Sequence, residues 1–227
     1  VYDGELCDAR FSKCCGGVFE QFEYCWEPKH FHYLGARRDD VAEDDYPDLR
    51  NENAASQWIQ TRPEAFCNTS DAAILSQVLN NYDQETKDFY RWEVRYTRRE
   101  LSELAARRSG IDFGDIVDMI PLERGTSGRI VRLKIVGTKR TMVIGKELEI
   151  RKTLSPSHLY SSAFVVERVG VDAATELPEA FVLHGAGWGH GVGLCQIGAA
   201  VMGARGYKYD AILSHYFIDA SIETLYK

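Results

Sequence analysis

The stretch His184-Gly185-Ala186-Gly187-Trp188-Gly189-His190-Gly191-Val192-Gly193 is the most informative part of this sequence. It places five glycines within nine residues, from Gly185 to Gly193. Glycine loses more backbone freedom on folding than any other residue, so a regular strand or helix with this composition is costly. The density predicts positive φ angles, or a backbone that closely approaches another group. We interpret that group as a ligand.

A helix is predicted directly after these glycines. Apolar residues recur at helical spacing at Leu194, Ile197, Ala200, Val201 and Ala204, and Gly206 stands where a helix often ends. The glycine-rich loop therefore leads into a helix N-terminus. Free backbone N–H groups and the positive end of the helix dipole favour an oxyanion or a sugar hydroxyl there. His190 and Gln196 lie beside that position.

The rest of the chain predicts a mixed α+β fold with an antiparallel meander-type sheet and several helices. Asp71 and its neighbours offer an N-cap before an apolar helical stripe, and Thr97 with Glu100 forms a capping box. Residues 90–96 alternate with the period of a half-buried strand, and residues 39–48 and 52–63 are interpreted as surface connections. Further strands are expected at 116–122, 130–136, 141–144, 164–169 and 180–183. The length of 227 residues favours one compact domain over residues 1–227.

Composition excludes several classes of partner. With 34 acidic and 27 basic residues, the formal charge of −7 gives no support for a surface that binds nucleic acid. No run approaches the ~20 apolar residues that a membrane-spanning helix needs. The chain opens at Val1 without a signal peptide, so any export signal is expected to lie upstream or to have been removed.

The cysteines admit two interpretations. Four of the six, Cys7, Cys14, Cys15 and Cys25, lie within the first 25 residues. Disulfides would fit an oxidising compartment, whereas Cys7, Cys14 and Cys15 would offer thiolates to zinc. No CxxC pair is present and the spacing is irregular, which favours disulfides. No cofactor is therefore expected to be required, and zinc is the less favoured alternative.

Known motifs narrow the chemistry of the loop. The glycines do not follow the GxGxxG spacing of dinucleotide sites, and the two histidines of the loop do not form HExxH. A cysteine near a helix N-terminus with a histidine close by is typical of an activated thiolate, so Cys195 with His190 suggests a cysteine-dependent cell-wall hydrolase. The alternative, which we favour, is that Cys195 is a small buried residue in the first helical turn.

Residues 184–199 resemble the HGxGxGHGVGxxQxGA motif of the stage II sporulation protein D and amidase enhancer (SpoIID/LytB) family. The likeness continues through Met202, His215, Tyr216 and Tyr226, where that family has a closing helix and a final strand. Upstream, Cys15-Gly16-Gly17-Val18 with Glu20, Glu23 and Trp26 is similar to the family's glycine-pair segment, and Ser127-Gly128-Arg129 resembles its SGR turn. The similarity covers most of the chain.

This resemblance implies an exported protein that processes peptidoglycan by lytic transglycosylation between MurNAc and GlcNAc. A carboxylic acid would protonate the glycosidic oxygen while the muramic C6 hydroxyl attacks the anomeric carbon. Peptidoglycan strands and a cell-wall amidase are the implied partners. The expected catalytic residues are His190, Gln196 and Glu20, and the expected substrate-binding residues are His184, Gly187, Trp188, Gly189, Gly191, Gly193 and Cys195.

One departure keeps a second function open. Members of that family carry their catalytic glutamate in a segment that precedes the first strand seen here, and no matching segment occurs in this sequence. The chain therefore looks as if it lacks an N-terminal segment of the domain. A non-catalytic peptidoglycan-binding module, or an amidase enhancer, fits the residues present as an alternative to the enzyme.

Overall fold

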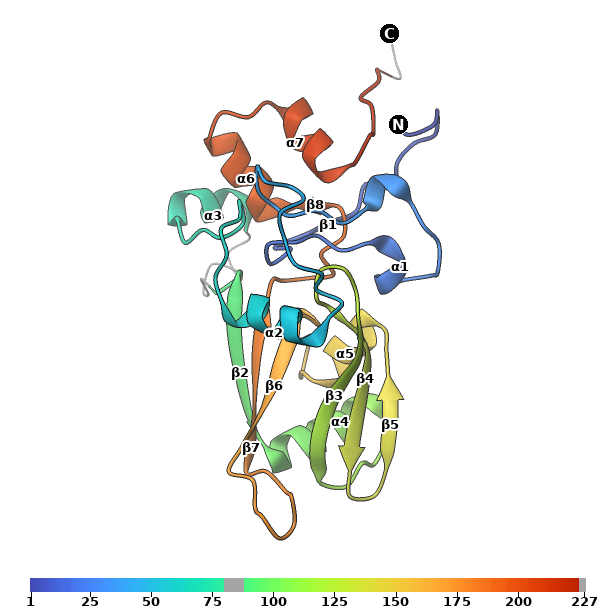
Figure 1. Ribbon diagram of the computed structural model, residues 1–227, viewed down its shortest axis with the longest axis vertical. Coiled ribbons are helices and arrows are strands. Elements are labelled where there is room, and N and C mark those ends of the chain that lie inside the picture. Colours follow the sequence, from blue (N-terminus) through green and yellow to red (C-terminus); the bar gives the residue numbers. More distant parts are fainter. Residues whose placement is uncertain (80–87, 225–227) are drawn as a thin grey trace. The chain divides into compact units, whose positions relative to one another are not determined.

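The computed structural model describes residues 1–79 and 88–224 and confirms an α+β fold with antiparallel sheets. The chain divides into two compact units (Figure 1). Unit 1 comprises Val1–Tyr46, Pro63–Tyr90 and Gly187–Lys227, and unit 2 comprises Pro47–Arg62 and Arg91–Ala186. Within the described ranges, no helix combines the length and hydrophobicity needed to cross a bilayer.

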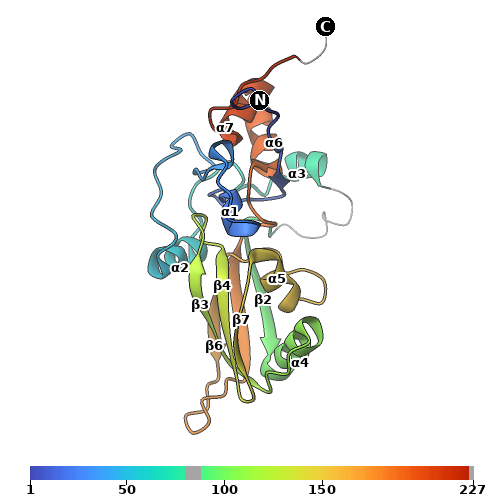
Figure 2. The same cartoon turned by 90° about the vertical axis from the view of Figure 1, so that its right-hand side faces the viewer.

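Unit 2 contains the predicted strands. One sheet has the order β2-β7-β6 and the other is a β3-β4-β5 meander, and all pairings in both are antiparallel (Figure 1; Figure 2 gives the view turned by 90°). The strands are β2 (Arg91–Thr97), β3 (Ile116–Arg124), β4 (Ile130–Gly137), β5 (Thr141–Ile144), β6 (Phe164–Val169) and β7 (Ala180–Ala186). Their buried faces share one core that includes Trp92, Phe113, Phe164 and Phe181. Period-two patterns therefore located these strands correctly.

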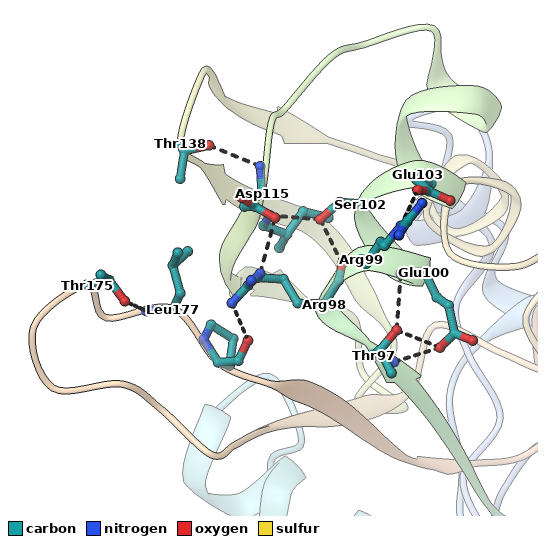
Figure 3. A network of polar contacts seen from close by, with 12 residues as sticks. Thr97, Arg98, Arg99, Glu100, Ser102, Glu103, Asp115, Thr138, Thr175 and Leu177 are labelled. Atoms are coloured by element: carbon teal, nitrogen blue, oxygen red, sulfur yellow. Dashed lines mark hydrogen bonds and ion pairs between the residues drawn. The ribbon is translucent and has the colours of Figure 1, made fainter.

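Two helices of unit 2 cover this core, and a third corrects the sequence interpretation. The predicted capping box opens α4 (Arg98–Ser109): the Thr97 hydroxyl accepts the Glu100 N–H, and the Glu100 carboxylate accepts the Thr97 N–H (Figure 3). Helix α5 is Glu147–Thr153. The expected connection at 52–63 is instead α2 (Glu52–Gln60), because Asn51 caps its first turn and its apolar side chains share one face.

Unit 1 has little regular structure. Its only sheet among the described residues is the parallel pair β1 (Phe11–Ser12) and β8 (Leu194–Cys195). Its helices are α1 (Phe22–Cys25), the 3-10 turn η1 (His32–Leu34), α3 (Ala72–Val78), α6 (Gln196–Ala204) and α7 (Tyr209–Tyr216). The predicted N-cap Asp71 and the predicted helix after the glycines are confirmed. No strand follows α7 up to residue 224, so the expected final strand is not found there, and Tyr226 lies outside the described residues.

The core of unit 1 gathers segments that are far apart in the sequence. Helix α3 packs against α6, and α6 contacts α7 (Figure 1). The buried cluster joins aromatic residues to cysteines, among them Phe19, Phe22, Tyr216, Cys14, Cys15, Cys67 and Cys195. Loops, rather than sheets, therefore position most of the candidate site.

Candidate functional site

The glycine-rich loop, residues 187–193, lies between two other segments of unit 1. On one side, the Trp188 N–H donates to the Cys14 carbonyl at 2.7 Å, and the Cys14 N–H donates back to the Trp188 carbonyl at 3.1 Å. On the other side, the Glu20 N–H donates to the Gly191 carbonyl at 2.9 Å. The loop therefore behaves as an irregular strand that is paired along both edges.

This pairing explains the glycines. Gly187, Gly189, Gly191 and Gly193 have φ angles of +73°, +97°, +80° and +69°, which confirms the predicted left-handed conformations. A Cβ atom at Gly187 would lie 2.8 Å from the Cys14 carbonyl oxygen. At Gly187, the group that the backbone approaches is thus another part of the chain. The expectation that the loop also approaches a ligand stays a prediction.

His190 is the best-defined polar side chain of the loop. Its Nδ1 accepts the Val192 N–H at 3.1 Å, which leaves the ring fixed at the surface in a half-buried position. The ring meets Trp26 edge-on, with centroids 4.8 Å apart. The neighbouring Cys25 thiol donates to the His190 carbonyl at 3.5 Å. His190 is therefore held from both its ring and its backbone.

Six aromatic and cationic residues on or next to β1, α1 and the glycine-rich loop make up what we call the aromatic face: Arg10, Phe11, Lys13, Trp26, Trp188 and His190. The Arg10 guanidinium lies 4.5 Å from the Trp26 ring centroid, and the Lys13 ammonium lies 4.7 Å from that of Trp188. Both distances permit cation–π attraction. Phe11 is 59% exposed.

The aromatic face does not include the other expected catalytic residues, Glu20 and Gln196, or the expected substrate-binding residue His184. Glu20 is fully buried, and its carboxylate accepts the Gln21 N–H at 2.9 Å. Gln196 is the first residue of α6 and is half-buried. His184 belongs to β7 of unit 2, where its Nε2 lies 2.9 Å from a Glu167 oxygen. His184 therefore belongs to a hydrogen-bonded contact on the β2-β7-β6 sheet, and not to the loop of unit 1.

All six cysteines lie within the described residues and all are free thiols, so the disulfide prediction is wrong. The suggested group of Cys7, Cys14 and Cys15 is not assembled either. The Sγ atoms of Cys15, Cys67 and Cys195, together with a carboxylate oxygen of Asp39, all lie within 4.8 Å of one another. Cys67 and Asp39 were not predicted as site residues, because neither stands at a recognisable spacing from the other members in the sequence.

Burial governs the protonation of these sulfurs. Burial raises the pKa of Cys14 and Cys15 well above the ordinary thiol value, and that of Cys67 to about 12. Burial opposes ionisation of Cys195 as well, but hydrogen bonds with the other three thiols outweigh it and bring its pKa well below the usual range. Cys195 is thus the most acidic thiol of the group, although it is completely buried.

Asp39 links the sulfurs to α7. Its Oδ1 accepts the Tyr216 hydroxyl at 2.7 Å and its Oδ2 accepts the Cys67 N–H at 3.0 Å. His215 lies beside it, with Nε2 3.5 Å from Asp39 Oδ1 and Nδ1 2.9 Å from Glu43. Burial lowers the pKa of His215, but the two carboxylates outweigh burial and raise it.

One family model matches the chain, over residues 20–193, and its description is domain of unknown function (DUF8618). This match includes the glycine-rich loop and covers more than half of the chain. It overturns the resemblance to the stage II sporulation protein D and amidase enhancer family, which is not matched. No curated protein matches the sequence.

Proposed function

This chain belongs to the DUF8618 family, a domain of unknown function, and we propose that it binds peptidoglycan glycan strands on its aromatic face. Two observations carry the proposal. Each of two half-buried tryptophans has a cation against its ring, Arg10 on Trp26 and Lys13 on Trp188. The Trp26 ring also meets the His190 ring edge-on. An envelope or extracellular location is part of the same proposal.

Aromatic rings favour sugars as the ligand. Indole and phenyl surfaces pack against the C–H faces of pyranose rings, and Trp also offers an N–H donor for a hydroxyl. Trp188 is backed by Phe89, with ring centroids 5.0 Å apart, and Trp26 is backed by Phe22 at 4.9 Å. Both tryptophans are therefore supported from below by the core, so little side-chain entropy remains to be lost on binding.

The cations favour an acidic glycan. Peptidoglycan carries carboxylates on the stem peptides that are attached to its muramic acid residues. Lys13 and Arg10 are half-buried cations on a chain whose formal charge is −7, so their placement runs against the overall charge. Arg10 also pairs with Asp8 at 2.8 Å. We take Lys13 as the candidate partner of a stem-peptide carboxylate, because its ammonium lies 4.7 Å from the Trp188 ring centroid.

Cleavage between MurNAc and GlcNAc remains a prediction, as does cooperation with an amidase. Protonating the glycosidic oxygen needs a carboxylic acid within hydrogen-bond reach of the strand. Glu20 is enclosed by protein, whereas the Glu23 side chain is 24% exposed and lies 2.8 Å from Nδ1 of His30. Glu20 is therefore not accessible to a strand, and Glu23 already has a partner in His30. For this reason we propose binding of the strands without cleavage as the main function.

The test is co-sedimentation of the chain with insoluble peptidoglycan, followed by fluorescence titration with soluble strands. The double variant Trp26→Ala/Trp188→Ala is expected to weaken binding at least tenfold. Tyr209→Ala is the matched control, because Tyr209 is an aromatic residue of the same unit that is 71% exposed and outside the aromatic face.

Mass spectrometry of the incubated strands tests cleavage separately. Anhydromuramic ends that disappear in Glu23→Gln would support an enzyme that uses this carboxylate. Binding of strands without formation of anhydromuramic ends would support a non-catalytic peptidoglycan-binding module. Equal binding by the wild type and the double variant, or no binding by either, would overturn the proposal.

A further inference from the structure

The buried thiols and carboxylate of unit 1 have the arrangement of metal ligands. We propose that Cys15, Cys67, Cys195 and Asp39, which we call the thiol–carboxylate cluster, form a tetrahedral Zn²⁺ site. Their four ligand atoms all lie within 4.8 Å of one another, and all four residues are buried. This inference is independent of glycan binding, because it concerns the interior of the unit.

The distance between the sulfurs fits a shared ion. The Sγ atoms of Cys15 and Cys67 are 3.6 Å apart. Two sulfurs bound to one zinc at about 2.3 Å in tetrahedral geometry are separated by about 3.8 Å. A disulfide would instead require about 2.05 Å. The observed separation therefore matches two ligands of one metal ion.

The surroundings of the cluster resemble the outer shell of a metal site. The Cys15 N–H points at the Cys195 sulfur, 3.2 Å away, and such N–H donors stabilise a thiolate. Asp39 is oriented by the Tyr216 hydroxyl and the Cys67 N–H. A Cβ atom at Gly198, in the first turn of α6, would lie 2.7 Å from Asp39 Oδ2. Glycine at this position leaves room for the carboxylate.

Charge and ligand chemistry select zinc. Three sulfur ligands with one carboxylate favour a borderline-soft divalent ion, and exclude Mg²⁺ and Ca²⁺, which prefer oxygen. Binding would form three Zn–S bonds and one Zn–O bond. Each cysteine that is protonated before binding would release its proton to solvent.

The four proposed ligands come from four separate segments of unit 1, so a bound ion would link these segments. Cys15 follows β1, Asp39 lies in the loop after η1, Cys67 precedes α3 and Cys195 immediately precedes α6. A single ion would therefore join four segments of a unit whose only described sheet has two residues per strand. It would also fix Cys195 at the end of the glycine-rich loop, and hence support the aromatic face.

The first test uses the reduced wild-type chain. After treatment with a chelator and removal of that chelator, Zn²⁺ or Co²⁺ is added and the bound metal is counted by native mass spectrometry. One ion per chain is expected, and the Co²⁺ form should show thiolate-to-cobalt charge-transfer absorption together with the visible bands of tetrahedral cobalt. No uptake at a one-to-one ratio, or cobalt binding without thiolate bands, would overturn the proposal.

The second test assigns the ligands. Cys67→Ser and Asp39→Asn are each expected to weaken Zn²⁺ affinity at least tenfold, measured by competition with a chromophoric chelator. Cys14→Ser is the matched control, because Cys14 is equally buried beside the cluster yet is not a member of it. Retention of zinc by Cys14→Ser supports the ligand set. Loss of zinc in Cys14→Ser with retention in Cys67→Ser overturns the proposed ligand set. If a variant fails to fold, the cobalt spectrum of the wild-type chain decides whether the site uses thiolate ligands.

Discussion

The sulfur of Cys15 lies 3.6 Å from the sulfur of Cys67, although 52 residues separate the two in the sequence. The contact is buried and reduced, and Cys195 joins it from a third segment. Long-range convergence of this kind fixes loops that have few backbone hydrogen bonds of their own. Because the thiols of this contact are buried, they are also expected to react slowly.

We expect all six cysteines to be titratable after the chain is unfolded in denaturant with a chelator and without reductant, because none forms a disulfide. In the native, zinc-loaded chain we expect the members of the thiol–carboxylate cluster to be protected, since buried and metal-bound sulfurs react slowly. Colorimetric thiol titration measures both counts. A value of four or fewer in the unfolded chain would show that a disulfide had formed.

Two glycines, Gly193 in the glycine-rich loop and Gly203 in α6, are expected to respond in opposite ways to substitution by alanine. Gly193 has φ +69° and a Cβ there would lie 3.0 Å from the Arg10 carbonyl carbon, so Gly193→Ala is expected to lower the unfolding free energy by about 1–3 kcal/mol. Gly203 lies in α6 with open space around it, so Gly203→Ala should raise it by about 0.5–1 kcal/mol. Denaturant unfolding of the two variants is the measurement. Equal effects would contradict the strained conformation assigned to Gly193.

Local signals in the sequence were sufficient for most of unit 2. Alternation located its strands, and the capping box at Thr97 located the start of α4, because both patterns depend on neighbouring residues only. Helix α2 was missed although Asn51 and the apolar residues Ala55, Trp58 and Ile59 carry the signal. There, the nearby proline and polar residues outweighed the helical spacing in the interpretation.

The candidate site of unit 1 depended on contacts that no local pattern encodes. The positive φ angles of the glycines were predictable, since density alone requires them. The structural reason for these φ angles could not be predicted, because the groups that crowd Gly187 and Gly193 belong to residues 10–15, which are distant in the sequence. Cys67 and Asp39 entered the cluster by tertiary folding, at sequence separations that match no ligand motif.

Lys13 predicts a charge-dependent part of glycan binding. Lys13→Ala is expected to weaken binding to strands that carry stem peptides by a factor of about 2–5, as for loss of a surface ion pair worth about 0.5–1 kcal/mol. Binding to strands without stem peptides should change less. Added salt should weaken this electrostatic contribution of Lys13 to binding, because it screens the charges. Titration with both strand types at two salt concentrations measures the effect, and an equal loss for both would refute the assigned carboxylate partner.

The capping box of α4 makes a stability prediction within unit 2. The Thr97 hydroxyl is the side-chain acceptor for the Glu100 N–H, so Thr97→Ala is expected to lower the unfolding free energy by about 1 kcal/mol. Thr97→Ser keeps the hydroxyl and should cost much less. Denaturant unfolding separates the two variants. Equal losses would attribute the effect to the methyl group rather than to the cap.

The same motif predicts a dependence on pH that involves the carboxylate of Glu100. The N–H and hydroxyl of Thr97 both donate to Glu100 Oε2 at 2.8 Å, and these bonds lower the pKa of Glu100 in the folded chain (Figure 3). Since the unfolded chain has the ordinary value of about 4.3, the stabilisation is fully present above that pH. It is lost as the pH falls through the lower, folded pKa.

Nuclear magnetic resonance titration of the Glu100 carboxyl carbon measures this shift directly. The pKa should lie below the ordinary glutamate value in the wild type and should move up towards it in Thr97→Ala, where the hydroxyl donor is gone and only the backbone donor remains. The stability advantage of the wild type over Glu100→Gln should likewise shrink below about pH 4, because the amide does not titrate. An unshifted pKa, or an advantage that grows as the pH falls, would show that the carboxylate does not close the capping box in solution.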